Sequence, residues 1–243
     1  MKKKFAIKKL LPAYITILAM FILISLVGSK AVSTISANAP AATGRIVVID
    51  AGHGGVDGGA TSVGGVLESH INLEISKKLN DLLHLIGIHT VMVRTEDVSI
   101  YTEGESIAEK KVSDLKNRIK IVNETDNAIL VSIHQNHFSE PKYKGAQVFY
   151  SPSGESMMLA KKMQTAFIET INPGSHRQIK KAKGVYLLEN IKNTGILIEC
   201  GFISNPEEDN LLQKKSYQNN VASVIATTIS KFFSETTSLD RIS

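Results

Sequence analysis

The chain has 243 residues, of which 43% are hydrophobic and 21% are charged. This composition is typical of a globular protein and excludes collagen-like, low-complexity and wholly disordered chains. The formal net charge is +5, but six of the 28 basic residues and none of the 23 acidic ones lie within residues 1–36. The remainder holds 22 basic and 23 acidic residues, a net charge of −1. We therefore expect no nucleic-acid partner, because binding one needs a basic surface.

The beginning of the chain has the pattern of an export signal. Five lysines within Met1–Lys9 precede an apolar run from Leu10 to Gly28. A basic region before such a run directs export, and roughly 19 apolar residues are also enough to span a bilayer. Residues 1–32 are therefore predicted to be either a cleaved signal peptide or a retained membrane anchor. The positive-inside rule places the rest of the chain outside the cytoplasmic membrane in both cases.

The remaining chain reads as one domain. Residues 33–44 are small and polar and contain Pro40, which predicts a linker. We expect the domain to cover residues 45–235 and a tail to follow over 236–243. The chain has one cysteine, Cys200, so an intramolecular disulfide is impossible. Its apolar surroundings in the sequence favour a thiol packed in the core over a nucleophile.

Predicted strands and helices alternate along this domain. A strand over 45–50 precedes an amphipathic helix over 68–86, which ends at Gly87. A strand over 89–94, a polar loop and a helix over 108–123 follow. The later elements are strands over 128–134 and 145–150, a helix over 154–171, short strands over 185–188 and 195–199, a helix begun by Pro206, and a helix over 217–233. This alternation predicts an α/β fold, with helices on both faces of one sheet.

Three of the predicted strands end in residues that can bind metal or transfer protons. The first strand leads into His53 in a glycine-rich turn, the third ends at His134, and the last ends at Glu199. Glu68 begins the first helix. Two neutral imidazoles and a carboxylate are a usual ligand set for catalytic zinc, with a fourth position left for water. The chain has no His-Glu-x-x-His helix, so such ligands must come from separate elements.

Each candidate also has an ordinary structural interpretation. Histidines at strand ends often only donate hydrogen bonds, and a glutamate at a helix start interacts favourably with the helix dipole. Asp50 could orient His53 or could make a strand-end hydrogen bond. Asn136 could contact substrate or backbone, and Arg177 could bind a substrate carboxylate or remain a solvated loop charge. For His70 and His137 we expect surface or supporting positions rather than metal binding.

Four motifs occur in a fixed order and spacing: Val48–Gly55, Glu68, Ser132–Asn136 and Ile198–Asn205. Together they resemble the zinc-dependent N-acetylmuramoyl-L-alanine amidases of the amidase-3 family, over residues 45–233. The resemblance implies a single mixed, mostly parallel sheet flanked by helices. It also implies one Zn²⁺ per chain bound by His53, Glu68 and His134, with Glu199 as the catalytic residue. The substrate implied is peptidoglycan, cleaved between the muramic acid lactyl group and L-Ala of the stem peptide.

The chemistry of the four residues agrees with that reaction. Zinc would polarise the lactyl carbonyl and lower the pKa of water to about 7, and Glu199 would pass a proton from water to the leaving amine. The sequence departs from common members at His137-Phe138, at Thr194-Gly195 and in a longer loop over 98–112. These differences concern the rim of the groove and therefore the substrate preference.

No wall-binding repeat follows Phe233, and a short exported amidase resembles the germination-specific, spore-cortex members of the family. That likeness implies stem-peptide removal during sporulation, before muramic-δ-lactam formation, in the space around the developing cortex. We also expect an envelope protein that targets or activates the enzyme. The alternatives are a general autolysin amidase, a zinc carboxypeptidase, a polysaccharide deacetylase, a non-catalytic peptidoglycan-binding module, or an envelope protein with an incidental histidine cluster.

Overall fold

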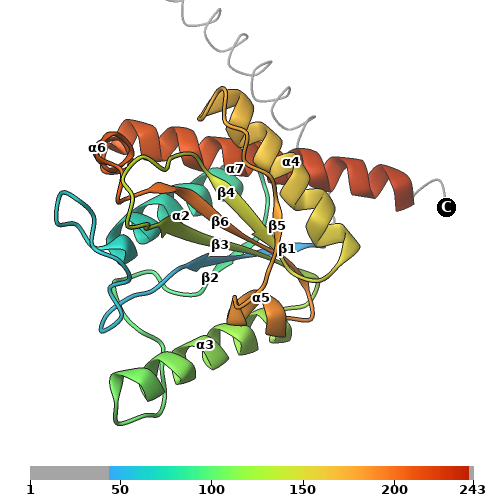
Figure 1. The fold of residues 1–243 in the computed structure, drawn as a ribbon. Coiled ribbons are helices and arrows are strands. Elements are labelled where there is room, and N and C mark those ends of the chain that lie inside the picture. The colour runs from blue at the N-terminus through green and yellow to red at the C-terminus, as the bar shows by residue number, and fades with distance from the viewer. Residues whose placement is uncertain (1–43, 241–243) are drawn as a thin grey trace, which may run out of the picture. The chain divides into compact units, whose positions relative to one another are not determined.

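The computed structural model describes residues 44–240. The predicted signal or anchor over 1–32 and nearly all of the predicted linker lie outside the described residues. Within the described part, six strands form one sheet in the order β2-β1-β3-β6-β4-β5 (Figure 1). None of its helices combines the length and the hydropathy needed to cross a bilayer.

The sheet is mixed and mostly parallel, as the family resemblance implies. Only the β4/β6 pair is antiparallel, and the other four pairs of neighbouring strands are parallel. The strands are β1 (Ile46–Ala51), β2 (Thr90–Met92), β3 (Ala128–Asn136), β4 (Gln147–Tyr150), β5 (Lys180–Lys181) and β6 (Thr194–Phe202). The central strands β1 and β3 are near-continuous apolar runs, as expected for parallel strands buried on both faces.

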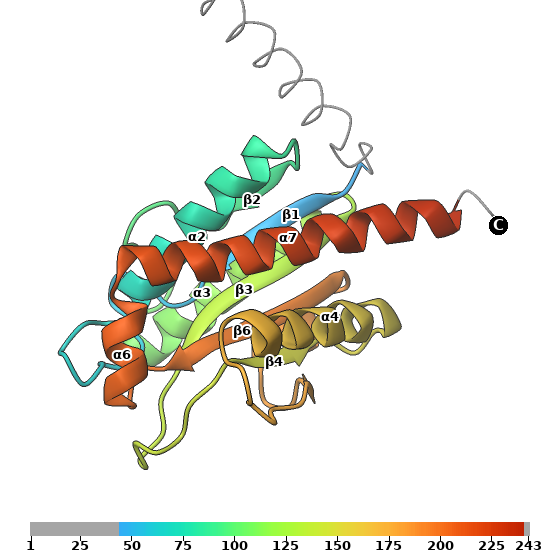
Figure 2. The same cartoon turned by 90° about the horizontal axis from the view of Figure 1, so that it is seen from above.

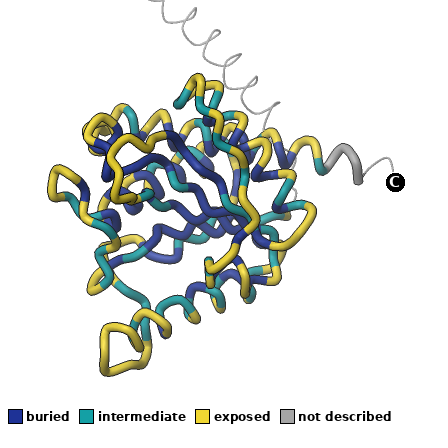
Figure 3. Tube along the Cα trace, in the orientation of Figure 1, coloured by how far each residue is buried: buried dark blue, intermediate teal, exposed yellow. Residues whose placement is uncertain are grey.

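Helices cover both faces of the sheet and create two apolar layers. The larger layer contains side chains of α2 (Glu68–Leu85), α4 (Gly154–Thr170) and α7 (Lys215–Asp240). The smaller layer contains side chains of α3 (Ile107–Glu124) and α5 (Tyr186–Asn190) on the opposite face. Figure 2 shows α7 running between α2 and α4, and Figure 3 shows the buried strands between the more exposed helices and loops.

Local signals in the sequence explain where several helices begin and end. Ser106 and Glu109 form a capping box at the start of α3. Asn205 caps α6 (Pro206–Leu212), in which Pro206 occupies the first turn as predicted. Gly87 follows α2 with a φ of 79°, a left-handed conformation that glycine adopts without strain. Each signal lies within a few residues of the helix end that it marks, so the predicted bounds of α2 and α3 and the start of α6 agree with the structure to within one residue.

The predicted strand over 185–188 is wrong. This segment lies in the short helix α5, and the edge strand of the sheet is Lys180–Lys181 instead. Leu187 and Leu188 are buried in the smaller apolar layer. A short apolar run is compatible with a strand or a helix, and periodicity does not distinguish them. The packing of the two leucines therefore decided the conformation.

A buried ion pair joins the centre of the sheet to α3. The Asp50 carboxylate accepts hydrogen bonds from Arg118 Nη1 and from Ser132 Oγ, the latter at 2.6 Å. Asp50 and Arg118 are both nearly inaccessible, with 1% and 2% of their surface exposed. Burial by itself would raise the pKa of Asp50, but the Arg118 charge and the Ser132 hydroxyl hold it below its ordinary value. The pair thus connects β1, β3 and α3.

Removal of this guanidinium is expected to destabilise the domain strongly. Arg118→Met leaves the Asp50 carboxylate buried without its charge partner, which costs roughly 3–5 kcal/mol of the free energy of unfolding. Urea denaturation followed by circular dichroism measures the loss. Lys116→Met, at an exposed position of the same helix, is the matched control and should change stability by about 0.5 kcal/mol or less. Equal stability of both variants would contradict this role of the ion pair.

Candidate metal centre and active site

The candidate site lies where β1, β3 and β6 end. His53 follows β1, His134 lies near the end of β3, and Glu199 is directly opposite His134 in the parallel β3/β6 pair. Glu68, the first residue of α2, reaches the same point from the helix. The carboxyl ends of parallel strands gather at one edge of a sheet, which is where α/β proteins place their sites. The residues predicted from four separate motifs are therefore neighbours in space.

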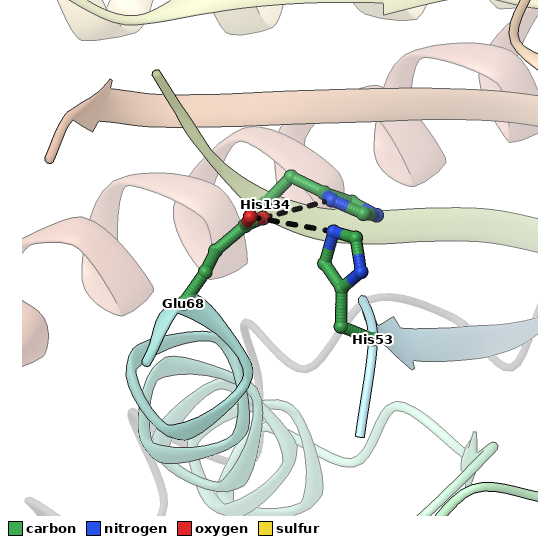
Figure 4. A group of neighbouring side chains, drawn as sticks. All are labelled: His53, Glu68 and His134. Atoms are coloured by element: carbon green, nitrogen blue, oxygen red, sulfur yellow. Dashed lines mark hydrogen bonds and ion pairs between the residues drawn. The ribbon is translucent and has the colours of Figure 1, made fainter. Parts of the chain in front are cut away.

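Glu68 lies between the two histidines (Figure 4). Its Oε1 is 3.0 Å from His134 Nδ1, and its Oε2 is 3.3 Å from His53 Nε2. One ligand atom from each of the three side chains lies within 4.8 Å of the other two. Burial opposes the charge on Glu68, but the hydrogen bonds from His134 and His53 hold its pKa far below the ordinary value. An ionised carboxylate and two imidazoles are ligands that zinc prefers.

Further hydrogen bonds fix the Glu68 carboxylate. The Ala60 amide donates to Oε2 at 3.1 Å, and the Gln135 amide donates to Oε1 at 3.1 Å. Asn72, one turn further along α2, donates to Oε1 at 3.2 Å and receives a hydrogen bond from the Gln135 side chain. Because residues four apart share one face of a helix, the Glu68–Asn72 spacing could have revealed this support. The sequence analysis missed Asn72.

Asp57 supports His53 from the other side. Its Oδ2 accepts a hydrogen bond from His53 Nδ1 at 3.0 Å and lies 3.1 Å from Lys111 Nζ. Burial opposes a positive charge on His53, but the hydrogen bonds to Asp57 and Glu68 outweigh it and raise the pKa of His53 to about 9. This environment attracts positive charge. Histidines that bind metal commonly donate their second ring nitrogen to a carboxylate in this way, so the residues present fit a bound metal ion.

Of the two alternatives left open for Asp50, the contact with His53 is not formed, and Asp57 supports that ring instead. The Asp50 carboxylate is engaged by Arg118 and Ser132, which confirms the alternative of a strand-end hydrogen bond. Asp50 lies within β1 and points to the α3 face, whereas the chain turns after the strand before it reaches His53. Asp57 lies four residues beyond His53 in the sequence. This short spacing was the signal that could have identified it as a partner of His53.

Two buried arginines hold the turn that carries His53. Arg94 Nε and Arg118 Nη1 both donate to the Ala51 carbonyl, at 2.8 and 3.0 Å. Arg118 Nη2 also donates to the His53 carbonyl at 2.7 Å. His53 has a φ of 61°, a left-handed conformation that a non-glycine residue adopts at an energetic cost. The guanidinium contacts stabilise this turn and thereby the direction of the His53 ring.

Gly52 leaves room for the second histidine. A Cβ atom at this position would lie 2.2 Å from His134 Nε2. No other residue fits unless the His134 ring moves out of the candidate site. Glycine is thus required here by a close side-chain approach.

Glu199 differs from Glu68 and Asp57 because its buried Oε2 finds no hydrogen-bond partner among the described residues. Burial raises the pKa of Glu199 to about 7, a value suited to a group that accepts and releases protons near neutrality. The adjacent Cys200 is fully buried, and burial raises the pKa of its thiol. The burial confirms the prediction of a thiol packed in the core.

The remaining candidates lie outside the group of three ligands. His70 is exposed and pairs with Asp97 at 3.0 Å, and His137 is also exposed, as expected. Asn136 lies opposite Phe202 in the β3/β6 pair. Arg177 lies beside the site, where Nη1 donates to Gln147 Oε1 at 3.3 Å. No contact with substrate follows from these positions alone.

The chain has clear similarity to known proteins. Residues 47–231 match the Amidase_3 family model, described as N-acetylmuramoyl-L-alanine amidase. The germination-specific N-acetylmuramoyl-L-alanine amidase of Bacillus subtilis is 37% identical over 195 residues, covering 79% of this chain and 81% of that protein.

Solved structures agree with the sequence comparison. The CwlD amidase from Clostridioides difficile, solved in complex with the GerS lipoprotein, has a TM-score of 0.75 and 36% identity, covering 78% of this chain and 98% of that chain. The N-acetylmuramoyl-L-alanine amidase AmiC2 of Nostoc punctiforme has a TM-score of 0.64 and 30% identity, covering 77% of this chain and 96% of that chain.

The support that Asp57 gives to His53 can be measured as metal affinity. Asp57→Ala removes the acceptor for His53 Nδ1, and we expect zinc to bind about 10–100-fold more weakly as a result. Competition with a chromophoric chelator measures the affinity of the full-length protein. Asp126→Ala, at an exposed turn position, is the matched control and should bind zinc like the unmodified chain. Unchanged affinity of Asp57→Ala would show that His53 needs no such support.

Proposed function

Since this chain belongs to the amidase-3 family of N-acetylmuramoyl-L-alanine amidases and is an enzyme of that kind, we propose that one Zn²⁺ held by His53, Glu68 and His134 serves its reaction. The observation that carries the proposal is the convergence of these three side chains within 4.8 Å. The buried Glu199 lies directly opposite His134 on the neighbouring strand. We assign Glu199 the role of general base and acid.

The roles of the residues follow from their positions. Zinc, when bound, polarises the lactyl carbonyl and lowers the pKa of water to about 7. Glu199 Oε2 has no competing hydrogen bond in the described part of the chain, so it can accept a proton from the attacking water. The same carboxyl group then donates this proton to the nitrogen of L-Ala as the amide bond breaks. Asp57 and Asn72 keep His53 and Glu68 oriented throughout.

We propose that the enzyme acts on the spore cortex. The likeness to the germination-specific amidase supports this assignment, and the chemistry agrees with it. Hydrolysis frees the lactyl carboxyl group of muramic acid, and that carboxyl group is needed to close a muramic-δ-lactam on the amino nitrogen of the same sugar. Amidase action would therefore come before N-deacetylation and lactam formation.

We further propose that the catalytic domain lies outside the cytoplasmic membrane and works with an envelope protein. The five lysines and the apolar run that begin the chain support export. The GerS lipoprotein found with the Clostridioides difficile amidase supports a lipoprotein as the kind of partner. Peptidoglycan is the substrate that this location offers.

Product analysis with a Glu199 variant tests the reaction. The full-length protein, purified with mild detergent and zinc, is incubated with spore-cortex and vegetative peptidoglycan, and mass spectrometry follows the products. We expect free stem peptides and intact glycan strands. Glu199→Gln should reduce the rate roughly 10²–10⁴-fold, while Glu169→Gln, exposed on α4, should leave it unchanged.

The products also separate the competing functions. Release of terminal D-residues or of acetate would favour a carboxypeptidase or a deacetylase. Equal release from vegetative wall would favour a general autolysin over a cortex enzyme. A zinc-loaded, folded protein that binds peptidoglycan and cleaves nothing, even after addition of an envelope extract from sporulating cells, would indicate a binding module.

The proposed partner predicts incomplete function of the chain alone. We expect an envelope extract from sporulating cells to raise both the bound zinc and the amidase rate of the purified protein. Metal analysis and product release are measured before and after the addition, with an extract from vegetative cells as the control. Full zinc loading and full activity without any extract would contradict the need for a partner.

A further inference from the structure

A cavity of about 560 Å³ lies beside the candidate active site. Its walls come from the loop after β3, the loop after α4, and α6. The lining includes three basic side chains, Lys142, Lys144 and Arg177, and two carboxylates, Glu207 and Glu208. Figure 1 shows α6 and the loop after β3 near the start of β4 and the end of β6.

The strand register connects this cavity with the reaction centre. Glu199 lies opposite His134 on one side and opposite Gln147 on the other. Directly opposite residues of paired strands point to the same face of a sheet, and neighbouring strands lie about 4.8 Å apart. His134, Glu199 and Gln147 therefore form one row on one face. Arg177 extends this row because its Nη1 donates to Gln147 Oε1 at 3.3 Å.

A β-bulge places the aromatic ring of Phe202 beside this row of side chains. From His134↔Glu199 to Asn136↔Phe202, β3 advances by two residues and β6 by three. The extra residue returns Phe202 to the face that carries Glu199. The Arg177 guanidinium carbon lies 4.5 Å from the centre of the Phe202 ring, a cation–π contact. Arg177 Nε also donates to the Lys144 carbonyl at 2.8 Å.

Within the described residues, Arg177 forms no direct ion pair, and Glu208 acts on its charge only from a longer distance. No carboxylate of residues 44–240 lies within ion-pair distance of its guanidinium, and its Nη2 donates no hydrogen bond within that range. The nearby Glu208 carboxylate accepts hydrogen bonds from the Gly145 and Phe202 amides at 2.9 and 2.7 Å, so the backbone engages it. Lys144 pairs with Glu207 at the exposed rim. Arg177 is thus a cation of the cavity lining whose position is fixed by hydrogen bonds and by the Phe202 ring.

We propose that Arg177 binds the free α-carboxylate of the second, acidic residue of the stem peptide, on the departing side of the cleaved bond. The inference rests on the proposed amidase reaction at Glu199. Two extended residues span roughly 7 Å, so a peptide whose first nitrogen lies at Glu199 brings that carboxylate to the guanidinium beyond Gln147. Guanidinium groups bind carboxylates with paired, charge-assisted hydrogen bonds.

Two substrates that differ in one group test this inference. Disaccharide–peptide fragments are prepared with the second residue either as the free α-acid or as the α-amide. For the full-length zinc-loaded enzyme we expect kcat/KM to be about 10–100-fold higher for the acid, the usual value of a charged hydrogen bond. Arg177→Gln should lose this preference, mainly through a higher KM for the acid, and Arg177→Lys should retain part of it. Lys161→Gln, at an exposed position of α4 outside the cavity, is the matched control and should keep the full preference.

Each outcome has a separate meaning. Equal cleavage of acid and amide by the unmodified enzyme overturns the assignment of Arg177 without use of any variant. An Arg177→Gln protein that loses thermal stability and activity on both substrates alike also overturns it, because the residue would then be structural. If the unmodified, zinc-loaded enzyme cleaves neither fragment nor intact peptidoglycan, with or without the envelope extract, the proposed function itself fails and this inference fails with it.

Discussion

The site depends on the hydrogen bonds that two buried arginines donate to the turn after β1. Arg94 and Arg118 donate to the carbonyls that the end of the strand leaves without partners in the sheet. An unpaired buried carbonyl is costly, so these contacts stabilise a turn that His53 enters in a left-handed conformation. The position of His53, and with it the space for His134 over Gly52, follows from this arrangement.

The electrostatics around this turn favour a divalent cation. Glu68 and Asp57 both contact His53, and Glu199 is buried opposite His134. Negative charge therefore concentrates around two imidazoles in a region of low solvent access, where interactions between charges are strong. The ion pair between Asp50 and Arg118 beneath the site neutralises the remaining carboxylate of β1. Asp50 thus belongs to a structural ion pair, whereas Glu68 and Asp57 contact the histidines of the candidate site.

The β6 bulge extends the site beyond His53, Glu68 and His134. Without the additional residue, the alternation of side chains would turn Phe202 to the opposite face of the sheet. With it, Phe202 supports Arg177 next to Gln147, one strand away from Glu199. A local irregularity of one strand therefore joins the reaction centre to a cavity whose charge suits the peptide portion of the substrate.

The sequence by itself determined the α/β order of the elements, most of their boundaries and the buried cysteine, because these depend on apolar periodicity and local capping. Its four motifs, through their resemblance to the amidase family, also pointed to His53, Glu68 and His134, which the fold brings together. Tertiary structure alone decided that Asp57 rather than Asp50 supports His53, that residues 186–190 form a helix, and that Arg177 lies in line with Glu199. Asp50 is engaged by the distant Arg118, the helix is fixed by packing, and the place of Arg177 follows from strand register, so each depends on segments distant in the sequence. Local propensity carries no information about such contacts, which is the physical reason that the sequence left them undetermined.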